Sequence, residues 1–150
     1  MSTIVAATHI PLFDRIAGFE ASFDGRLMDA VGLKLSLQRD LGRLFNSRNG
    51  LSIEAFLASE ASVLHYGLPD LLVLSPRSAL DLEKLEAVVA HGIALYEPRL
   101  SHVSVKAHTD PQNHASAHVT ITAAVYVGKQ LCRVDFEVLM GSEVEFQGAV

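Results

Sequence analysis

The sequence predicts an α+β domain in which N-terminal helices pack on one face of a C-terminal antiparallel β-meander. Two observations predict this fold. Apolar residues recur with helical spacing as far as Tyr96, and after Arg99 they alternate with a period of two. The length of 150 residues and the hydrophobic content of 49% suit one core. We therefore expect a single domain over residues 26–150, preceded by a partly flexible N-terminal arm over residues 1–25.

The first helix is expected over Gly32–Asn46, because five apolar residues share one helical stripe. These residues are Leu33, Leu37, Leu41, Leu44 and Phe45. The turn-forming residues 46–50 should end this helix.

A second helix is expected after Ser52, a plausible N-cap. The helical period continues through Ala61 to Leu64, and Gly67 can supply a left-handed residue at the C-terminal end.

A third helix is expected after Ser78, which with Asp81 three residues later resembles a capping box. Pro98 should end it, because proline disfavours helical angles in the preceding residue, Glu97. The apolar face expected between these limits consists of Leu82, Leu85, Val89, Ile93 and Tyr96.

The remaining chain reads as strands. Apolar residues alternate with polar ones over residues 103–107, 119–127, 132–140 and 144–146. Gly128-Lys129 has the form of a two-residue type II′ hairpin turn, and Gly141-Ser142 is interpreted as a second Gly-X turn.

Composition excludes several function classes. The net charge of −5 and the absence of a basic block argue against a nucleic-acid-binding surface. A single cysteine, Cys132, excludes an internal disulfide framework, and its phase in the strand pattern predicts a buried core residue. Neither a signal peptide nor a membrane-spanning segment is evident, so we expect a cytoplasmic protein. Common nucleotide, zinc-protease and hydrolase motifs are absent, which lowers the expectation of an enzyme.

Four histidines flank the first predicted hairpin, namely His102, His108, His114 and His118. A metal site would need three or four ligands converging at about 2 Å. Without cysteines or a clear supporting carboxylate other than Asp110, we interpret them as solvated residues and expect neither a metal nor a cofactor.

Glu97-Pro98-Arg99 is the most unusual local feature. Proline fixes an extended kink between helix and sheet, so that the two charged side chains can point to the same side. They could pair with each other, bind a partner's charged groups, or simply be solvated at a helix end. As a glycosidase acid, Glu97 would need a second carboxylate about 5–10 Å away. Asp70 and Asp110 are available in the sequence, but nothing in it ties them to Glu97.

Four short motifs occur in a fixed order: Pro11–Arg15, Arg39–Arg48, Tyr66–Asp70 and Tyr96–Leu100. Together they resemble the family of phage tail baseplate wedge proteins, sometimes labelled lysozyme-like. TssE, the type VI secretion baseplate subunit, belongs to that family. The resemblance extends over nearly the whole chain from residue 11, and Gly-Leu-Pro-Asp and Glu-Pro-Arg carry most of it.

The resemblance implies a structural, non-catalytic role in a contractile injection machine. A TssE-like chain joins the wedge subunits TssF and TssG and initiates assembly of the sheath. It further implies that Glu97, Pro98 and Arg99 form a partner-binding motif. Residues 1–25 are then expected to order on a wedge partner.

A mechanism for sheath binding follows from the expected sheet. A sheath subunit could add a strand to an edge, for which Ser101–Ala107 and Glu143–Gln147 are the candidates. On this interpretation Arg99→Ala should leave the fold intact and weaken partner capture. The alternatives are a peptidoglycan-cleaving enzyme with Glu97 as general acid, and a generic self-associating α+β domain.

Overall fold

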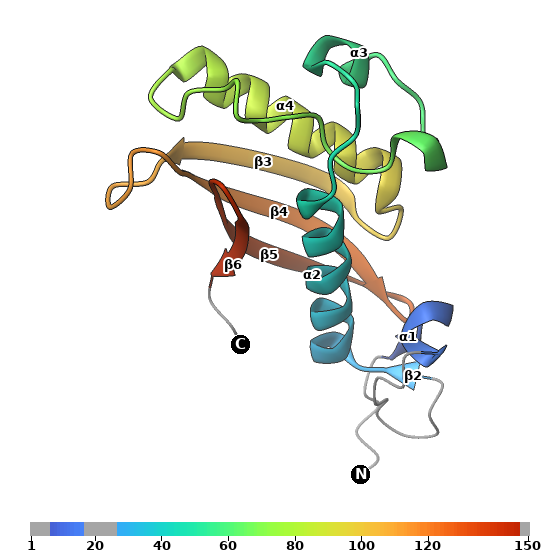
Figure 1. Ribbon diagram of the computed structural model, residues 1–150. Helices are drawn as coiled ribbons and strands as arrows, with labels where there is room; N and C mark the ends of the chain where they lie inside the picture. Colours follow the sequence, from blue (N-terminus) through green and yellow to red (C-terminus); the bar gives the residue numbers. More distant parts are fainter. Residues whose placement is uncertain (1–6, 17–26, 148–150) are drawn as a thin grey trace.

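The computed structural model describes residues 7–16 and 27–147. It confirms the α+β fold, with helices in the N-terminal half and a four-stranded antiparallel sheet after them (Figure 1). The elements in order are β1 (Thr8–His9), α1 (Leu12–Ile16), β2 (Leu27–Met28), α2 (Ala30–Asn46), α3 (Ile53–Leu57), the 3₁₀ turn η1 (Val63–His65), α4 (Ala79–Tyr96), β3 (Ser101–Thr109), β4 (Ala117–Val127), β5 (Gln130–Met140) and β6 (Val144–Gln147).

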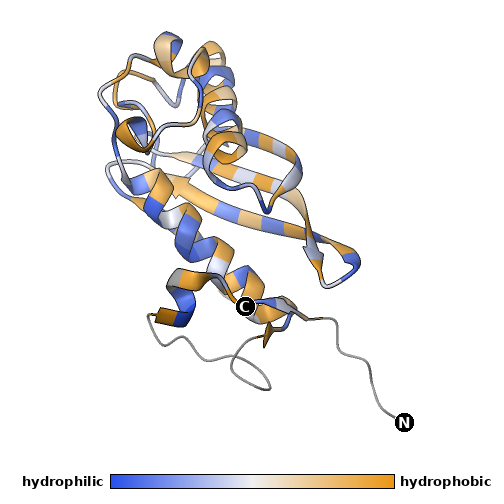
Figure 2. Cartoon of the chain, turned by 90° about the vertical axis from the view of Figure 1, so that its right-hand side faces the viewer, coloured by the Kyte–Doolittle hydropathy of each residue, from blue (hydrophilic) through white to orange (hydrophobic). Residues whose placement is uncertain are grey.

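The sheet is a meander with strand order β3-β4-β5-β6. At its centre Ile121 of β4 lies between Val105 of β3 and Phe136 of β5. The predicted alternation is confirmed, since inward residues of β4 are buried and their neighbours are partly exposed. Figure 2 shows the same alternation of hydropathy along the strands. His102 has a positive φ of 51° where the register of β3 shifts between Ser101 and Ser104, so β3 begins with an irregularity.

The two predicted hairpin turns have different outcomes. Gly128 has a φ of 63° and Lys129 does not have a positive φ, as a type II′ turn requires. The prediction of a similar turn at Gly141-Ser142 is wrong. Three residues connect β5 to β6, and Gly141 has no positive φ. A Cβ at Gly141 would lie 2.7 Å from Ser116 Oγ, so a larger residue there would displace the serine hydroxyl.

One core joins the inward face of the sheet to α2 and α4. Leu37, Leu41 and Phe45 of α2 pack in the same buried cluster as residues of α4 and the sheet. Fully or almost fully buried members from α4, β4 and β5 are Val88, Val89, Ile93, Val119, Ile121 and Val138. The helices therefore cover the apolar face of the meander, as the sequence predicts. The expectation that Cys132 of β5 is buried is wrong, since this residue is partly exposed.

Both long helices begin with a side-chain cap. Asp29 accepts a hydrogen bond from Gly32 N–H at 2.8 Å, so α2 begins two residues before its predicted start. Ser78 Oγ accepts from Asp81 N–H at 3.3 Å at the start of α4, as predicted. The structure also confirms that α4 ends at Tyr96, immediately before the Glu97-Pro98 pair.

Replacing the cap of α4 should weaken the fold measurably. We expect Ser78→Ala to lower the free energy of unfolding by about 1 kcal/mol, because one N-terminal amide of the helix loses its acceptor. Urea denaturation followed by circular dichroism measures this. The exposed Ser142→Ala serves as a control for loss of a hydroxyl, and equal midpoints for the two variants would contradict the prediction.

The prediction of a long second helix is wrong beyond Leu57. Ser52 caps α3 as expected, but α3 ends after five residues. Ser59 Oγ then donates to Phe56 O at 2.6 Å, and Ser62 Oγ accepts from Leu64 N–H at 3.2 Å. Such local serine bonds compete with helix formation. Leu64, expected on the buried face, is 85% exposed.

Part of the expected N-terminal arm lies against the domain. β1 pairs with β2 through Thr8–Met28 and His9–Leu27, and Ile10 belongs to the core. Residues 1–6 and 17–25 of the arm lie outside the described residues. Within the described part of the chain, no helix has the length and apolar character needed to cross a membrane.

Candidate functional site

The Glu97-Pro98-Arg99 corner connects α4 to β3. Glu97 N–H donates to Ile93 O at 2.8 Å, which closes the last turn of α4. Leu100 N–H then donates to Glu97 O at 3.2 Å, and the Leu100 side chain is buried. Pro98 is exposed at the apex. The corner is thus anchored on both sides and presents its proline to solvent.

The two charged side chains of the corner pair with each other. Arg99 Nε donates to Glu97 Oε1 at 2.7 Å, and Arg99 Nη2 donates to Glu97 Oε2 at 2.8 Å. Glu97 is only 5% exposed, whereas the side chain of Arg99 keeps 26% of its surface. Of the alternatives drawn from the sequence, internal pairing is therefore the arrangement that the structure has. A planar guanidinium suits this two-bond geometry.

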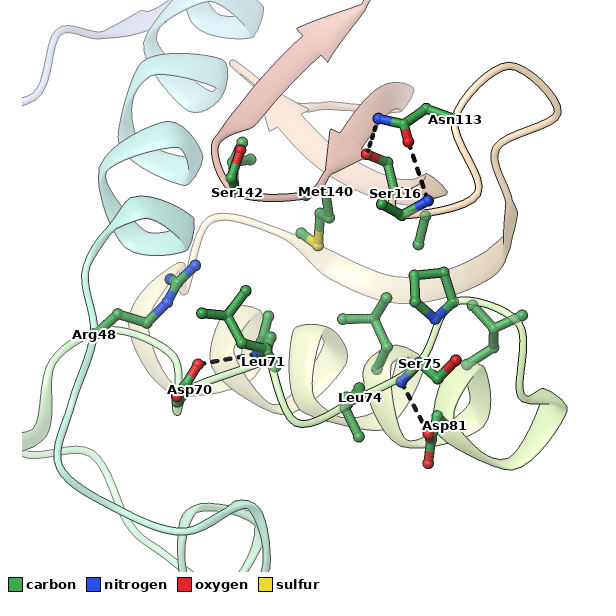
Figure 3. A pocket seen from close by; sticks show the side chains of 18 residues that line it. Arg48, Asp70, Leu71, Leu74, Ser75, Asp81, Asn113, Ser116, Met140 and Ser142 are labelled. Atoms are coloured by element: carbon green, nitrogen blue, oxygen red, sulfur yellow. Dashed lines mark hydrogen bonds between the residues drawn. The ribbon is translucent and has the colours of Figure 1, made fainter.

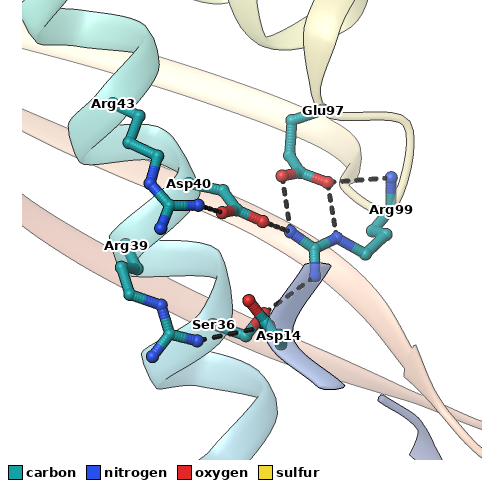
Figure 4. Close-up of polar contacts among 7 residues, drawn as sticks. All are labelled: Asp14, Ser36, Arg39, Asp40, Arg43, Glu97 and Arg99. Carbon is teal, nitrogen blue, oxygen red and sulfur yellow. Dashed lines mark hydrogen bonds and ion pairs between the residues drawn. The ribbon is translucent and has the colours of Figure 1, made fainter. Parts of the chain in front are cut away.

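Arg99 also joins the corner to α2 (Figure 4). Its Nη2 lies 2.6 Å from Asp40 Oδ2, and its Nη1 donates to Ser36 Oγ at 3.1 Å. Burial by itself would lower the pKa of Arg99, but the hydrogen bond to Glu97 and the charges of Glu97 and Asp40 outweigh it. The net effect raises the pKa, and the guanidinium stays charged.

The same network reaches α1. Ser36 Oγ donates to Asp14 Oδ2 at 2.5 Å, and Asp14 Oδ2 lies 3.2 Å from Arg39 Nη2. Asp14 is 2% exposed, and Asp40 also pairs with Arg43 at 3.1 Å. We call these seven residues the corner network: Asp14, Ser36, Arg39, Asp40, Arg43, Glu97 and Arg99. It contains three carboxylates and three guanidiniums, so its charges balance.

Sequence reasoning singled out only Glu97 and Arg99 from this network as site residues. Ser36, Asp40 and Arg43 have a signal in the sequence, since spacings of four and three residues put them on one helical face. Asp14 lies 22 positions before Ser36, and no local pattern indicates that such a distant carboxylate is buried there.

A cavity of about 320 Å³ adjoins the corner network. Pro11, Asp14, Arg43 and Tyr66 contribute to its lining. Partial burial, and then the charge of Asp40, raise the pKa of Tyr66, so the phenol keeps its proton. Its ring lies edge-on to Tyr96 at 5.2 Å. An aromatic donor therefore stands beside the charged corner.

A larger groove of about 700 Å³ lies at the other end of the sheet (Figure 3). Leucines 71, 74, 82 and 85 and Met140 give it an apolar lining. Its carboxylates support backbone turns: Asp70 Oδ1 accepts from Leu72 N–H at 3.0 Å, and Asp81 Oδ2 accepts from Ser75 N–H at 2.9 Å. Both carboxylates therefore hold backbone amides in place and do not point toward a bound molecule.

The geometry gives Glu97 no arrangement for acid catalysis. Both oxygens of Glu97 accept hydrogen bonds from Arg99. Asp40, the other carboxylate that Arg99 contacts, is paired with the same guanidinium. A general acid needs an accessible proton. Asp70 lines the other groove instead, and Asp110 is absent from the lining of both cavities.

The hairpin histidines do not gather at one point. His108 and His118 are cross-strand neighbours with ring centroids 4.9 Å apart, and His118 Nδ1 lies 3.4 Å from Glu137 Oε2. His114 is in the loop before β4 and His102 is at the start of β3. Among residues 7–16 and 27–147, no group of three or more His, Cys, Asp or Glu side chains is placed to hold a metal ion.

Both predicted edge strands lie at edges of the sheet, but the β3 edge is covered. Glu86 of α4 accepts a hydrogen bond from the edge amide of Ala107 at 2.9 Å and lies 3.5 Å from Lys106 Nζ. Near the end of β3, Thr109 Oγ1 donates to Pro76 O at 2.5 Å. These contacts occupy the side where a further strand would pair with β3.

Comparison with known proteins identifies the class of this small α+β domain. Residues 31–130 match the model of the family described as baseplate wedge protein gp25. Because the match spans more than half of the chain, the chain belongs to this family of structural baseplate components.

A solved structure also has a similar fold. It is described as "The baseplate complex from the type VI secretion system". One of its chains superimposes with a TM-score of 0.53 and 20% identity, covering 73% of this chain and 95% of that chain. No curated protein matches.

Proposed function

We propose that this chain is a TssE-like subunit of a type VI secretion baseplate, acting in the cytoplasm without catalytic turnover. The observation that carries the proposal is the family match over residues 31–130. In this role the chain binds TssF-like and TssG-like wedge subunits and initiates sheath assembly by strand pairing. No small-molecule substrate, cofactor or nucleic acid takes part.

The corner is the proposed contact with a wedge partner. Pro98 is exposed, and about a quarter of the Arg99 side chain remains accessible. Glu97 contributes indirectly, since its buried carboxylate fixes the orientation of the guanidinium. A rigid donor loses little conformational entropy when a partner carboxylate or backbone carbonyl binds to it. Pre-organisation of Arg99 thus supports a recognition role.

Co-purification with wedge and sheath subunits of the same secretion system tests the role. The wild-type chain is expected to capture both kinds of subunit. Failure to capture either one, or cleavage of peptidoglycan by the wild type that is lost in Glu97→Gln, would contradict the proposal.

A charge at the apex of the corner tests the contact itself. We expect Pro98→Glu to weaken capture of the wedge subunits about tenfold, because an added carboxylate beside Glu97 repels acidic partner groups. Quantitative pull-down measures this, and thermal melting verifies the fold. Gln112→Glu adds the same charge on the exposed β3–β4 loop as the matched control. Equal capture by the two variants would exclude the corner as the contact.

A further inference from the structure

The larger groove, of about 700 Å³, is apolar from its floor to its rim. Three of its lining residues are at most 7% exposed and form the floor: Leu85, Ala117 and Met140. Leu74 and Leu82 are partly buried beside them, and Leu72 lines the groove while it remains 79% exposed. The apolar surface thus continues out of the groove to solvent, which is typical of a site for a protein partner.

The groove lies away from both ends of the described chain, residues 7 and 147. Ala117 lines the groove at the start of β4, and Gly128 directly follows the other end of that strand. A Cβ on Gly128 would lie 3.0 Å from Ala7 O, so the length of β4 puts residue 7 about 30 Å from the groove. β6 leads away from the groove, because Val144 lines it and the strand then continues to Gln147.

The backbone around the groove is already hydrogen-bonded within the chain. Lining amides that have acceptors in the turns and neighbouring elements are those of Leu72, Leu74, Ser75, Ser116, Gly141 and Val144. An extended strand docked here would leave its own N–H and C=O groups unpaired against an apolar surface, which costs free energy. A helix satisfies its backbone internally, so the groove suits a helix and not a strand.

The charge at one end of the groove indicates what the helix carries. Of the described residues that line the groove, only Arg48 is basic. Its Nη1 donates to two backbone carbonyls at the end of α2, Phe45 O and Ser47 O, which leave its charge in place. The lining carboxylates, Asp70 and Asp81, each accept from a backbone amide. An acidic group of a partner therefore complements Arg48.

We propose that this groove binds an amphipathic α-helix of a wedge subunit. Apolar residues spaced three and four apart on that helix face Leu74, Leu82 and Met140, and an acidic residue at its edge faces Arg48. Leu72 packs against the side of the helix. In naming a wedge subunit, this inference rests on the proposed function, where sheath subunits bind by strand pairing and the groove offers a strand no partners.

A charge on the rim of the groove tests the apolar contact. We expect Leu72→Glu to weaken capture of purified wedge subunits at least about tenfold, because the new carboxylate would lose water against the apolar face of the helix. Leu80→Glu is the matched control, since Leu80 is 70% exposed on α4 but does not line the groove. Thermal melting verifies the fold of both variants. Equal capture by the two would overturn the proposal.

The charge of Arg48 is tested separately. Arg48→Gln keeps a donor for the carbonyls at the end of α2 and removes the charge. We expect it to weaken wedge capture about threefold and to make capture less sensitive to salt than in the wild type. Arg77→Gln removes the same charge from an exposed residue outside the groove. If both variants capture alike, the proposed acidic contact is overturned.

Photo-crosslinking tests whether the bound segment is a helix. The exposed Ser142 lines the groove and is replaced by p-benzoylphenylalanine, while the same replacement at Gln112 on the β3–β4 loop is the control. Only position 142 should crosslink to a wedge-subunit segment with apolar residues three and four apart. A synthetic peptide of that segment should gain helicity in circular dichroism with the wild type and not with Leu72→Glu. Strand-like alternation in the segment would overturn the proposal.

The outcomes separate this inference from the proposed function. If the wild type captures no wedge subunit, the proposed function fails. If it captures them and Leu72→Glu behaves like Leu80→Glu, the groove is not the contact and the proposed function stands. If Leu72→Glu instead weakens only sheath capture, or abolishes a dimer of the isolated chain in sedimentation, the groove belongs to another partner and the proposal is overturned.

Discussion

Arg99→Ala is expected to lower the free energy of unfolding by about 3 kcal/mol. The substitution removes both donors from the buried Glu97 carboxylate, together with the contacts to Asp40 and Ser36. Losing one member of a wholly buried ion pair costs about 3–5 kcal/mol, and the partial exposure of Arg99 puts the expected cost at the low end. Urea denaturation at neutral pH measures the effect.

Arg43→Ala is the matched control for Arg99→Ala. Arg43 also pairs with Asp40, but its side chain is 56% exposed and it makes no contact with Glu97. Solvent-exposed pairs contribute at most about 1 kcal/mol, so this variant should unfold close to the wild type. If the two variants lose equal stability, the buried Glu97 carboxylate is not what makes Arg99 important.

This prediction changes how a functional test of Arg99 must be read. The sequence alone indicates that Arg99→Ala leaves the fold intact, because nothing in it shows that Glu97 is buried. The structure shows a corner that fastens α4 and β3 to α2 and α1. Loss of partner capture by Arg99→Ala would therefore combine misfolding with loss of a contact. The exposed Pro98 separates the two effects.

Periodic features of the fold could be predicted from the sequence, and features that depend on distant contacts could not. The stripe of α2, the Ser78 cap of α4 and the alternation in β4 are repeated or local signals, and each is confirmed. The carboxylate half of the expected capping box is not formed, because Asp81 Oδ2 accepts from Ser75 N–H. The residues beyond Leu57 have helical apolar spacing but do not form the helix that this spacing predicts. The prediction fails because Ser59 and Ser62 bond to nearby backbone, and Tyr96 OH contacts Ser62 O and His65 O, both at 3.0 Å.

In the candidate site, too, the local geometry could be predicted from the sequence and the tertiary contacts could not. The proline-fixed geometry that brings Glu97 and Arg99 to one side follows from three adjacent residues, and the structure has it. Asp14 and Ser36 join them through tertiary packing that no spacing rule describes.

Gly67→Ala is expected to destabilise the fold by about 3 kcal/mol or more. Gly67 has a φ of 111°, which strains any residue with a Cβ, and that atom would lie 2.5 Å from Ser47 O. The neighbouring chain cannot easily yield, because Leu68 N–H donates to Ser47 O at 2.9 Å and Asn49 N–H donates to Leu68 O at 3.0 Å. Thermal and urea unfolding measure the loss.

Gly50→Ala tests whether this effect comes from the backbone of Gly67 or from any added methyl group. Gly50 lies in the same region, has no positive φ, and a Cβ there meets nothing within 4 Å. Alanine at such a site leaves stability unchanged or raises it by up to about 1 kcal/mol, since it restricts the unfolded chain. Similar losses in the two variants would mean that the Gly-Leu-Pro-Asp motif does not require its left-handed glycine. A large loss confined to Gly67→Ala would show why the motif contains glycine: residues 47–49 approach residues 67–68 too closely for a Cβ. This contact joins the end of α2 to the segment that leads into α4.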